Sequence, residues 1–412
     1  MEYGLIAEKL SHSFSKEIHN RIADYTYELK EISKGELEDF LTKREFKAIN
    51  VTIPYKSSVI PYLDFIDDIA KQIGAVNTVV NKNGKLYGFN TDFFGLKALI
   101  EKNNVQIKNK KVLVLGSGGT SKTANAVAKS LGADSVYTVS RKESDGCITY
   151  EDVYSEHTDA QIIINTTPCG MFPNIKELAI DIEKLSGLEA VIDVVYNPLC
   201  SELVVKAKEK GIKAVGGLYM LVAQAVFACE KFLDKTFDNS VIDTVYSEIL
   251  SQKQNIVLIG MASCGKSTVG KQLSELLHRP FYDTDVLIEE KTGYHPSVII
   301  TQQGEEVFRS IESDTIEEIS AVSGTVIATG GGAVIKKINR ENLSKNGVAF
   351  FLDRPFEKLI ATPDRPLSSD REALKKRYKD RYPIYTSFAD FTISGEKSVE
   401  EICDIIKKEM KL

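Results

Sequence analysis

The stretch 256-IVLIGMASCGKSTVGKQLSELL-277 decides the fold of the last part of the chain. Its apolar start predicts a buried strand, and the pattern after Ser267 predicts a helix. Between them, 260-GMASCGKS-267 matches the phosphate-loop pattern G-x-x-x-x-G-K-[ST], in which backbone N–H groups and a helix N-terminus face the phosphates of a nucleotide. We expect Lys266 to reach the β and γ phosphates of ATP and the Ser267 hydroxyl to ligate Mg²⁺. The residues that we assign to nucleotide binding are Gly260, Cys264, Gly265, Lys266, Ser267 and Thr268.

The composition is that of an ordinary globular protein, with 43% hydrophobic and 27% charged residues. The length of 412 residues predicts roughly three domains with ample chain for their cores. The formal net charge of −6 argues against a nucleic-acid partner, because the phosphates of a nucleic acid would be repelled. The chain has no run of about eighteen apolar residues, so we expect no membrane-spanning helix.

Cysteine usage and the N-terminal sequence favour a cytoplasmic protein. The six cysteines stand singly without a CxxC pair, which suits a reducing cytosol and predicts no metal site made of cysteines. The start 1-MEYGLIAEKLSHS-13 lacks a basic region followed by an apolar core, so we expect no signal peptide.

Two series of apolar runs alternate with helical patterns, and each series predicts a parallel sheet with crossover helices. The first series spans 110–215 and the second begins at 256. A further helical pattern ends near Leu250, and the polar stretch 251-SQKQN-255 is the expected linker. In the mixed first part, strands are expected near 3–7, 26–30, 48–53 and 78–81. We therefore predict an α/β protein with three units, which are 1–105 with 217–250, then 106–216, then 256–412.

The turn 116-GSGGTS-121 follows the apolar run 111-KVLVL-115 and opens a helical pattern, as in a Rossmann-type dinucleotide-binding domain. Gly116 permits the tight turn, and Gly118 lets the backbone approach a pyrophosphate. The small Ser121 stands where the usual fingerprint has Gly or Ala.

The next predicted strand ends in Ser140, Arg141 and Lys142. An NAD site normally has an acidic residue at this place for the ribose 2′-hydroxyl, whereas a basic residue suits the 2′-phosphate of NADP. The sequence therefore predicts NADP(H) as the cofactor.

Seven further motifs, together with this glycine turn, resemble shikimate dehydrogenase over the part of the chain before the expected linker. They are 11-SHSFS-15, 50-NVTIPYK-56, 75-AVNT-78, 90-NTD-92, 165-NTTPCGM-171, 193-DVVYNP-198 and 216-GGLYMLVAQA-225. The resemblance implies that Ser13 and Ser15 bind the carboxylate of the substrate, and that Lys56 and Asp92 form the catalytic pair. By the same resemblance, the ring and its hydroxyls are held by Asn50, Thr52, Asn77 and Gln224, and the cofactor is bound by Gly116, Gly118, Gly119, Ser121, Ser140, Arg141, Lys142, Asn165 and Thr166.

The chemistry of hydride transfer requires such a pair. Reduction of a ketone develops negative charge on its oxygen, and a lysine ammonium can supply both positive charge and a proton there. The carboxylate of Asp92 would orient Lys56 and share the substrate hydroxyl. The other reading of the two residues is an ordinary surface ion pair.

Residues 256–412 resemble shikimate kinase through 283-DTD-285, 308-FRSIE-312, 329-TGGGA-333, 364-DRPL-367 and 381-RYPIY-385. Asp283 is expected to reach Mg²⁺, together with Ser267, and Asp285 is expected to accept the proton of the attacking hydroxyl. Arg365 resembles the lid arginine that stabilises charge during phosphoryl transfer. The residues expected to bind the substrate are Arg309 and Arg381, which suit a carboxylate, and Gly330, Gly331 and Gly332, which let backbone approach it.

The two resemblances predict a bifunctional enzyme with small-molecule substrates, because the product of the dehydrogenase is the substrate of the kinase. The first part would reduce 3-dehydroshikimate with NADPH, and the last would phosphorylate shikimate with MgATP. One alternative is an NAD-linked quinate/shikimate dehydrogenase. Another is a dehydrogenase with a degenerate, regulatory kinase-like module, since the chain is short between 350-FFLD-353 and Arg365 and lacks the basic residue expected near Ala361 to lie against the adenine.

Overall fold

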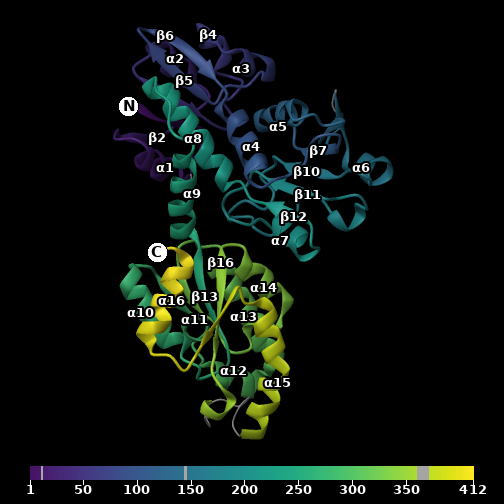
Figure 1. Cartoon of the computed structure of the whole chain (residues 1–412), viewed down its shortest axis with the longest axis vertical. Helices are drawn as coiled ribbons and strands as arrows, with labels where there is room; N and C mark the ends of the chain where they lie inside the picture. The colour runs from purple at the N-terminus through teal and green to yellow at the C-terminus, as the bar shows by residue number, and fades with distance from the viewer. Residues whose placement is uncertain (11–12, 143–145, 360–370) are drawn as a thin grey trace. The chain divides into compact units, whose positions relative to one another are not determined.

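A computed structural model of the chain describes residues 1–10, 13–142, 146–359 and 371–412 (Figure 1). The chain divides into two compact units, Met1–Ile249 and Leu250–Leu412. The first unit contains two six-stranded sheets and the second unit contains one five-stranded sheet. The predicted α/β class with parallel sheets is confirmed.

The first sheet is mixed and has the strand order β2-β1-β3-β5-β6-β4. Strand β1 is parallel to β2 and β3, whereas β5 is antiparallel to β3 and β6. The β5–β6 hairpin turns at Asn83 and Gly84, whose φ angles of 54° and 80° are those that a two-residue Asn-Gly turn requires. The strands are β1 Tyr3–Ala7, β2 Tyr27–Glu31, β3 Ala48–Val51, β4 Phe65–Ile66, β5 Thr78–Lys82 and β6 Lys85–Phe89.

Helices α4 and α8 of this part lie side by side (Figure 1). Gly95 on α4 permits their close contact, because a Cβ there would lie 2.8 Å from Met220 O and 2.9 Å from Gln224 Cβ on α8. This contact determines where Gln224 lies. The helices are α1 Ser15–Ile22, α2 Leu37–Lys43, η1 Ile60–Tyr62, α3 Asp68–Ile73, α4 Thr91–Lys102, α8 Leu218–Leu233 and α9 Ser240–Lys253.

The second sheet is parallel throughout, with the order β12-β11-β10-β7-β8-β9. The order reverses at β7 and β10, and in such sheets a ligand binds at the carboxyl ends of the strands beside this reversal. The strands are β7 Lys111–Leu115, β8 Ser135–Val139, β9 Cys147–Ile148, β10 Ile162–Asn165, β11 Ala190–Asp193 and β12 Lys213–Val215. The helices are α5 Gly119–Ser130, α6 Tyr150–Glu156, η2 Ile182–Lys184 and α7 Glu202–Glu209.

The sheet of the second unit is also parallel, with the order β14-β15-β13-β16-β17. Helices cover both of its faces (Figure 1), and the central strand β13 is fully apolar and buried from Ile256 to Ile259, as a strand covered on both sides must be. The strands are β13 Asn255–Ile259, β14 Phe281–Asp283, β15 Val326–Ala328, β16 Gly347–Asp353 and β17 Phe391–Ser394. The helices are α10 Lys266–Leu277, α11 Thr284–Thr292, α12 Pro296–Gln303, α13 Glu305–Ser320, η3 Ala333–Ile335, α14 Lys337–Ser344, η4 Phe356–Lys358, α15 Arg371–Phe388 and α16 Val399–Met410.

The stretch 251–255, which the sequence predicts as a linker, lies directly after the boundary between the two units and consists of a helix end and the start of a strand. Helix α9 continues through Lys253 and β13 begins at Asn255. The backbone of this stretch is held in place, because Arg279 donates to Ser251 O at 2.6 Å and to Gln254 O at 3.0 Å. Its polar side chains therefore belong to a helix end that joins a strand.

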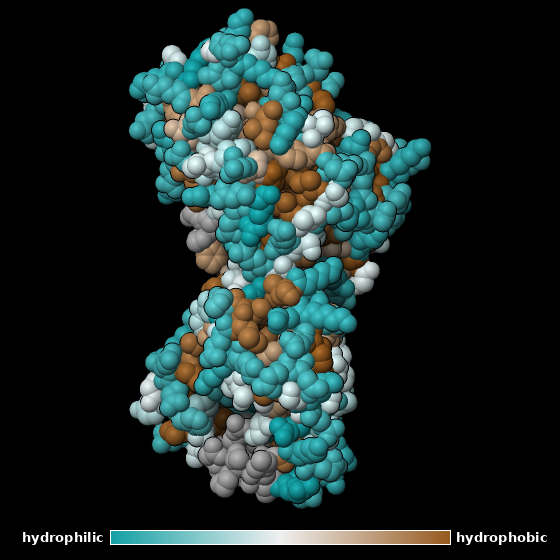
Figure 2. All heavy atoms as spheres, turned by 60° about the vertical axis from the view of Figure 1, so that its left-hand side comes forward, coloured by the Kyte–Doolittle hydropathy of each residue, from teal (hydrophilic) through white to brown (hydrophobic). Residues whose placement is uncertain are grey.

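Hydrophilic residues predominate on the face drawn in Figure 2, and apolar residues occur there in separate groups. None of the described helices is long and apolar enough to cross a membrane.

Candidate active sites

In the first unit, the structure brings Lys56 and Asp92 together as the sequence predicts. Lys56 Nζ donates to Asp92 Oδ2 at 2.6 Å, and the two side chains are only 12% and 8% exposed. Lys56 Nζ also lies 3.2 Å from Thr120 Oγ1, in the first turn of α5. Asp92 lies in the first turn of α4, which is capped by the side chain of Asn90 through Phe93 N. The pair is therefore a partly buried one beside the glycine turn, and not a surface ion pair.

The amides expected to hold a ring lie next to this pair. Asn77 Nδ2 lies 3.4 Å from Gln224 Oε1 on α8 and 3.0 Å from Thr91 Oγ1, and Asn77 Oδ1 accepts from Thr91 N at 2.7 Å. Thr91 precedes Asp92, so these bonds connect the amide of Asn77 to the first turn of α4. Thr52 follows β3 and is half-buried, with its carbonyl accepting from Tyr55 N.

Asn50 is buried and forms several hydrogen bonds with protein groups. Its Oδ1 accepts from Tyr27 OH at 2.7 Å, and its Nδ2 donates to Thr78 Oγ1 at 3.2 Å and to Asn77 O at 3.3 Å. The ring of Tyr27 stacks on His19 with centroids 3.8 Å apart. Burial lowers the pKa of His19 to about 3, so this imidazole is neutral near pH 7.

The serines expected to bind a carboxylate lie at the start of α1. Ser13 Oγ accepts from Ser15 N at 3.2 Å, and Ser15 is buried. Tyr196 hydrogen-bonds to the Ser13 side chain, and burial raises the pKa of this tyrosine. Tyr196 and Thr120 both lie within quoted motifs, 193–198 and 116–121, but neither was predicted as a site residue.

The glycine turn after β7 has the backbone that its sequence predicts. Gly116 has a φ of 106°, and a Cβ there would lie 2.9 Å from Thr166 Oγ1. A Cβ at Gly119 would lie 3.2 Å from Lys56 Cβ, so the turn passes close to the candidate catalytic lysine. Gly118 has open space around it and Ser121 is buried in α5.

The loop after β10 is fixed by buried polar groups. Thr166 Oγ1 donates to Leu115 O at 2.6 Å, and Asn165 Nδ2 donates to Asp193 Oδ1 at 2.9 Å. Asp193 also accepts from Ser201 Oγ at 2.5 Å and from Val195 N at 2.9 Å. Burial raises the pKa of Asp193 to about 7.

The basic residues expected at the cofactor follow directly on β8, the neighbour of β7. Arg141 and Lys142 are exposed, and Lys142 N donates to Ser140 Oγ at 3.3 Å. An exposed position at the carboxyl end of this strand is where a 2′-phosphate could be reached.

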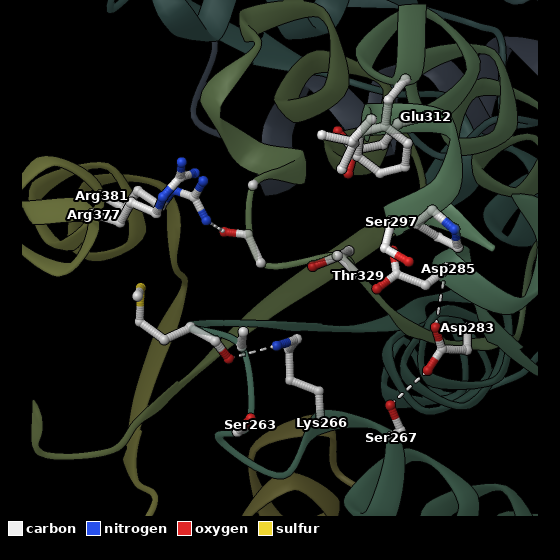
Figure 3. Close-up of a pocket in the computed structure, with 18 of the residues that line it drawn as sticks. Ser263, Lys266, Ser267, Asp283, Asp285, Ser297, Glu312, Thr329, Arg377 and Arg381 are labelled. Carbon is white, nitrogen blue, oxygen red and sulfur yellow. Dashed lines mark hydrogen bonds between the residues drawn. The ribbon is translucent and has the colours of Figure 1, made fainter. Parts of the chain in front are cut away.

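In the second unit, a cavity of about 490 Å³ collects the kinase-like motifs (Figure 3). Lys266 is buried, and its Nζ donates to Gly260 O at 3.0 Å. It also donates to Met261 O at 2.8 Å (Figure 3). The phosphate loop has positive φ at Gly260 and Gly265, of 141° and 105°. Cys264 is 3% exposed and its Sγ lies 3.7 Å from Lys266 Nζ. The cavity is lined by Gly265, Lys266, Ser267, Thr268, Asp283, Asp285, Arg309, Gly330, Gly331, Gly332 and Arg381 among others.

Two oxygen groups on one side of this cavity fit a magnesium ion. Ser267 Oγ donates to Asp283 Oδ2 at 2.6 Å, and Asp283 Oδ1 accepts from Asp285 N at 3.1 Å (Figure 3). Mg²⁺ is commonly held by one or two such protein oxygens together with phosphate oxygens and water. The described residues contain no group of three or more histidines, cysteines and acids that could hold a metal ion.

The candidate acceptor end of the cavity is built around arginines and glycines. Arg309 donates to Glu312 Oε2 at 2.7 Å and to Glu305 Oε1 at 3.0 Å, and Arg381 donates to Gly331 O at 3.0 Å. Glu312 is fully buried, and burial raises its pKa.

The three glycines 330–332 allow the walls of the cavity to approach one another closely. A Cβ added at Gly330 would lie 2.9 Å from Asp285 Oδ1, and one added at Gly331 would lie 3.0 Å from Ala262 N. A Cβ added at Gly332 would overlap the guanidinium of Arg309.

Two residues of this cavity, Glu312 and Arg377, were not predicted from the sequence. Glu312 stands within the quoted motif 308–312 but received no role, and Arg377 lies outside every quoted motif. Arg365 and Ala361 lie outside the described residues.

Comparisons with known proteins agree with the two-part reading. The family model for shikimate kinase matches residues 262–411, and that for the shikimate dehydrogenase substrate binding domain matches residues 5–79. The chain is 38% identical to the shikimate dehydrogenase (NADP(+)) of Clostridium beijerinckii over 262 residues, which cover 60% of this chain and 96% of that protein.

Solved structures also match the first unit. The shikimate dehydrogenase 1 of Peptoclostridium difficile has a TM-score of 0.57 at 36% identity, with 60% of this chain and 98% of that chain covered. A chorismate mutase/shikimate 5-dehydrogenase fusion protein from Clostridium acetobutylicum has a TM-score of 0.57 at 35% identity, with 60% and 96% covered.

The fold and the buried lysine–aspartate pair beside a dinucleotide turn define a dehydrogenase of the Rossmann class, followed by a phosphate-loop domain. The chain belongs to the shikimate dehydrogenase family, and its second unit matches the shikimate kinase model. The resemblance read from the sequence is confirmed for both parts.

Proposed function

We propose that the chain is a bifunctional cytoplasmic enzyme that reduces 3-dehydroshikimate to shikimate with NADPH and phosphorylates shikimate with MgATP. The proposal rests on the presence of two candidate sites in one chain. The expected product of the first site, shikimate, is the expected substrate of the second. One site is the Lys56–Asp92 pair beside the dinucleotide turn, and the other is the cavity of about 490 Å³ behind the phosphate loop.

In the first site, Lys56 acts as the proton donor. NADPH, when bound, supplies the hydride that is added to the carbonyl carbon. Lys56 Nζ gives its proton to the carbonyl oxygen, so that the ketone becomes a hydroxyl and the amine is then reprotonated from water. Asp92 at 2.6 Å holds the ammonium in place, and Thr120 accepts a second N–H from it.

Substrate binding in this site is assigned to groups around the pair. Asn77 and Gln224 offer amides to hydroxyl groups, while Asn50 holds Asn77 and Thr78 through its own hydrogen bonds. Ser13 and Ser15 bind the carboxylate, and Arg141 with Lys142 binds the 2′-phosphate of the cofactor.

In the second site, Asp285 accepts the proton of the attacking hydroxyl, and Lys266 stabilises the negative charge of the phosphoryl oxygens. Mg²⁺, when bound to Ser267 and Asp283, supplies further positive charge. Arg309 and Arg381 hold the acceptor so that its hydroxyl faces the γ phosphate.

A coupled assay on the full chain tests both activities. The chain is incubated with 3-dehydroshikimate, NADPH and MgATP, and both the loss of NADPH and the formation of shikimate 3-phosphate are followed. We expect both signals, and in the reverse assay we expect shikimate to be oxidised with NADP⁺ more efficiently than with NAD⁺. NADPH loss without shikimate 3-phosphate would favour the regulatory kinase-like module, and a preference for NAD⁺ would favour the NAD-linked alternative.

A further inference from the structure

Three guanidinium groups line the acceptor end of the kinase-like cavity, and they have different partners. Arg309 is engaged by two carboxylates, Glu305 and Glu312. Arg381 donates to the carbonyl of Gly331. Within the described part of the chain, no carboxylate forms an ion pair with Arg377 or Arg381. Arg377 and Arg381, both on α15, are therefore the two arginines at the acceptor end of the cavity that have no carboxylate ion-pair partner among the described residues.

Arg377 and Arg381 stand four residues apart on α15, so their side chains are neighbours on one face of the helix. Figure 3 shows them side by side at the cavity, on the side opposite to Ser267 and Asp283. Burial and the charges of Arg381 and Arg309 lower the pKa of Arg377, and nearby Glu305 and Asp380 oppose this only in part. Such a like-charge pair is unfavourable by itself, and an anion bound between the two groups relieves it.

We propose that Arg377 binds the carboxylate of the phosphoryl acceptor, and that it shares this carboxylate with Arg381. The inference rests on the proposed kinase function and adds a residue that the resemblance did not supply. A guanidinium fork suits a carboxylate, because two parallel N–H bonds meet its two oxygens. Arg309 also holds the acceptor, but its guanidinium is already paired with Glu305 and Glu312, so Arg377 adds positive charge that Arg309 alone does not supply.

The neighbouring residue Lys376 offers a matched control. It is exposed and carries the same charge, but it does not line the cavity of about 490 Å³. Lys376→Gln and Arg377→Gln therefore change the net charge equally, and only the second removes a group from the cavity.

The test measures kinase kinetics of the full chain with shikimate and with ATP varied separately. Arg377→Gln should raise the KM for shikimate about tenfold, the scale of one charge-assisted hydrogen bond, with little change in kcat or in the KM for ATP. Arg377→Lys should restore part of the loss, because it keeps the charge without the fork. Lys376→Gln should behave as wild type.

A neutral acceptor identifies the group that Arg377 contacts. With shikimate methyl ester, wild type and Arg377→Gln should have the same KM, because the carboxylate charge is gone. An unchanged KM for shikimate in Arg377→Gln, a rise only in the KM for ATP, or an equal loss with the ester would each overturn the proposal.

Absence of kinase activity in wild type would refute the proposed function and leave Arg377 to be judged by binding. Calorimetric titration of shikimate into the full chain then separates the two sites. Loss of one of two binding events in Arg377→Gln supports the proposal, and identical titrations of variant and wild type overturn it.

Discussion

Lys56 in the first unit and Lys266 in the second unit have different kinds of hydrogen-bond partner. Both side chains are largely buried. Lys56 lies in the turn after β3, and Lys266 lies at the end of the phosphate loop after β13. Lys56 has a carboxylate, Asp92, at 2.6 Å and a hydroxyl at 3.2 Å. Lys266 has two backbone carbonyls at 3.0 and 2.8 Å.

The partners determine what each lysine offers to a substrate. A carboxylate cancels the formal charge of Lys56, so the pair is neutral overall and suits a proton transfer to a ketone oxygen. Carbonyl groups orient Lys266 without cancelling its charge, which remains available to phosphate oxygens. One lysine is therefore expected to act through its proton and the other through its charge.

The largest effect on activity is expected for Asp285→Asn, in the site that contains Lys266. It should lower the kcat of phosphorylation about 10⁴-fold, because an amide cannot accept the proton of the attacking hydroxyl. The rate of shikimate 3-phosphate formation measures the loss. NADPH-dependent reduction by the same variant is the control and should be unchanged, since Asp285 lies in the second unit. Near-normal phosphorylation would mean that another group takes the proton.

Lys56→Ala is the reciprocal change. It should lower the kcat of reduction about 10³-fold with a much smaller change in the KM for 3-dehydroshikimate, because a proton donor acts mainly in the transition state. Steady-state NADPH oxidation measures the effect, and kinase activity serves as the control. If reduction falls only through KM, Lys56 binds the substrate and the contrast with Lys266 disappears.

The sequence predicted best those features that short contiguous segments determine. The phosphate loop 260–267 and the glycine turn 116–121 carry their positive-φ glycines within a few residues, so their structure is local. Strand β6 was missed, although the Asn83-Gly84 turn was a readable sign of a hairpin.

Contacts between distant segments could not be read in the same way. Thr120 contacts Lys56 across 64 residues, and Arg377 lines the same cavity as Arg309 only because α15 folds against it. The helix end at 251–255 is a further example, because Arg279, far along the chain, binds the carbonyl groups of Ser251 and Gln254. The candidate site was thus predictable where residues are carried by motifs, and unpredictable where packing supplies them.

A charge reversal at the cofactor has a smaller expected effect than either catalytic change. Arg141→Asp should raise the KM for NADPH about 10- to 100-fold, because it removes a cation from the 2′-phosphate and adds a repelling carboxylate. The KM for NADH should change little. Lys129→Asp is the matched control, since Lys129 is also an exposed base and lies near the end of α5. An equal loss with both cofactors would place Arg141 away from the 2′-phosphate.

The smallest expected effect concerns thermal stability and depends on a buried carboxyl group of the first unit. Asp193 is buried and accepts hydrogen bonds from Asn165, Val195 and Ser201, and burial raises its pKa to about 7. The usual pKa of an aspartate is about 3.9, so between about pH 4 and pH 7 the folded state keeps a proton that the unfolded state has lost. The contribution of Asp193 to the free energy of unfolding is therefore full below about pH 4 and is lost as the pH rises to about 7.

Asp193→Asn removes this dependence while keeping the hydrogen bonds, because its Oδ1 can accept from Asn165 and Val195 and its Nδ2 can donate to Ser201 Oγ. The Tm of the variant relative to wild type should rise by a few degrees between pH 5 and pH 8, given about 2–4 °C for each kcal/mol in a domain of this size. Thermal unfolding of the full chain followed by circular dichroism at each pH gives the comparison. Asp134→Asn, which removes an exposed carboxylate next to β8, should show no such trend. A pH-independent difference between Asp193→Asn and wild type would show that Asp193 is ionised throughout this range and held by its three donors.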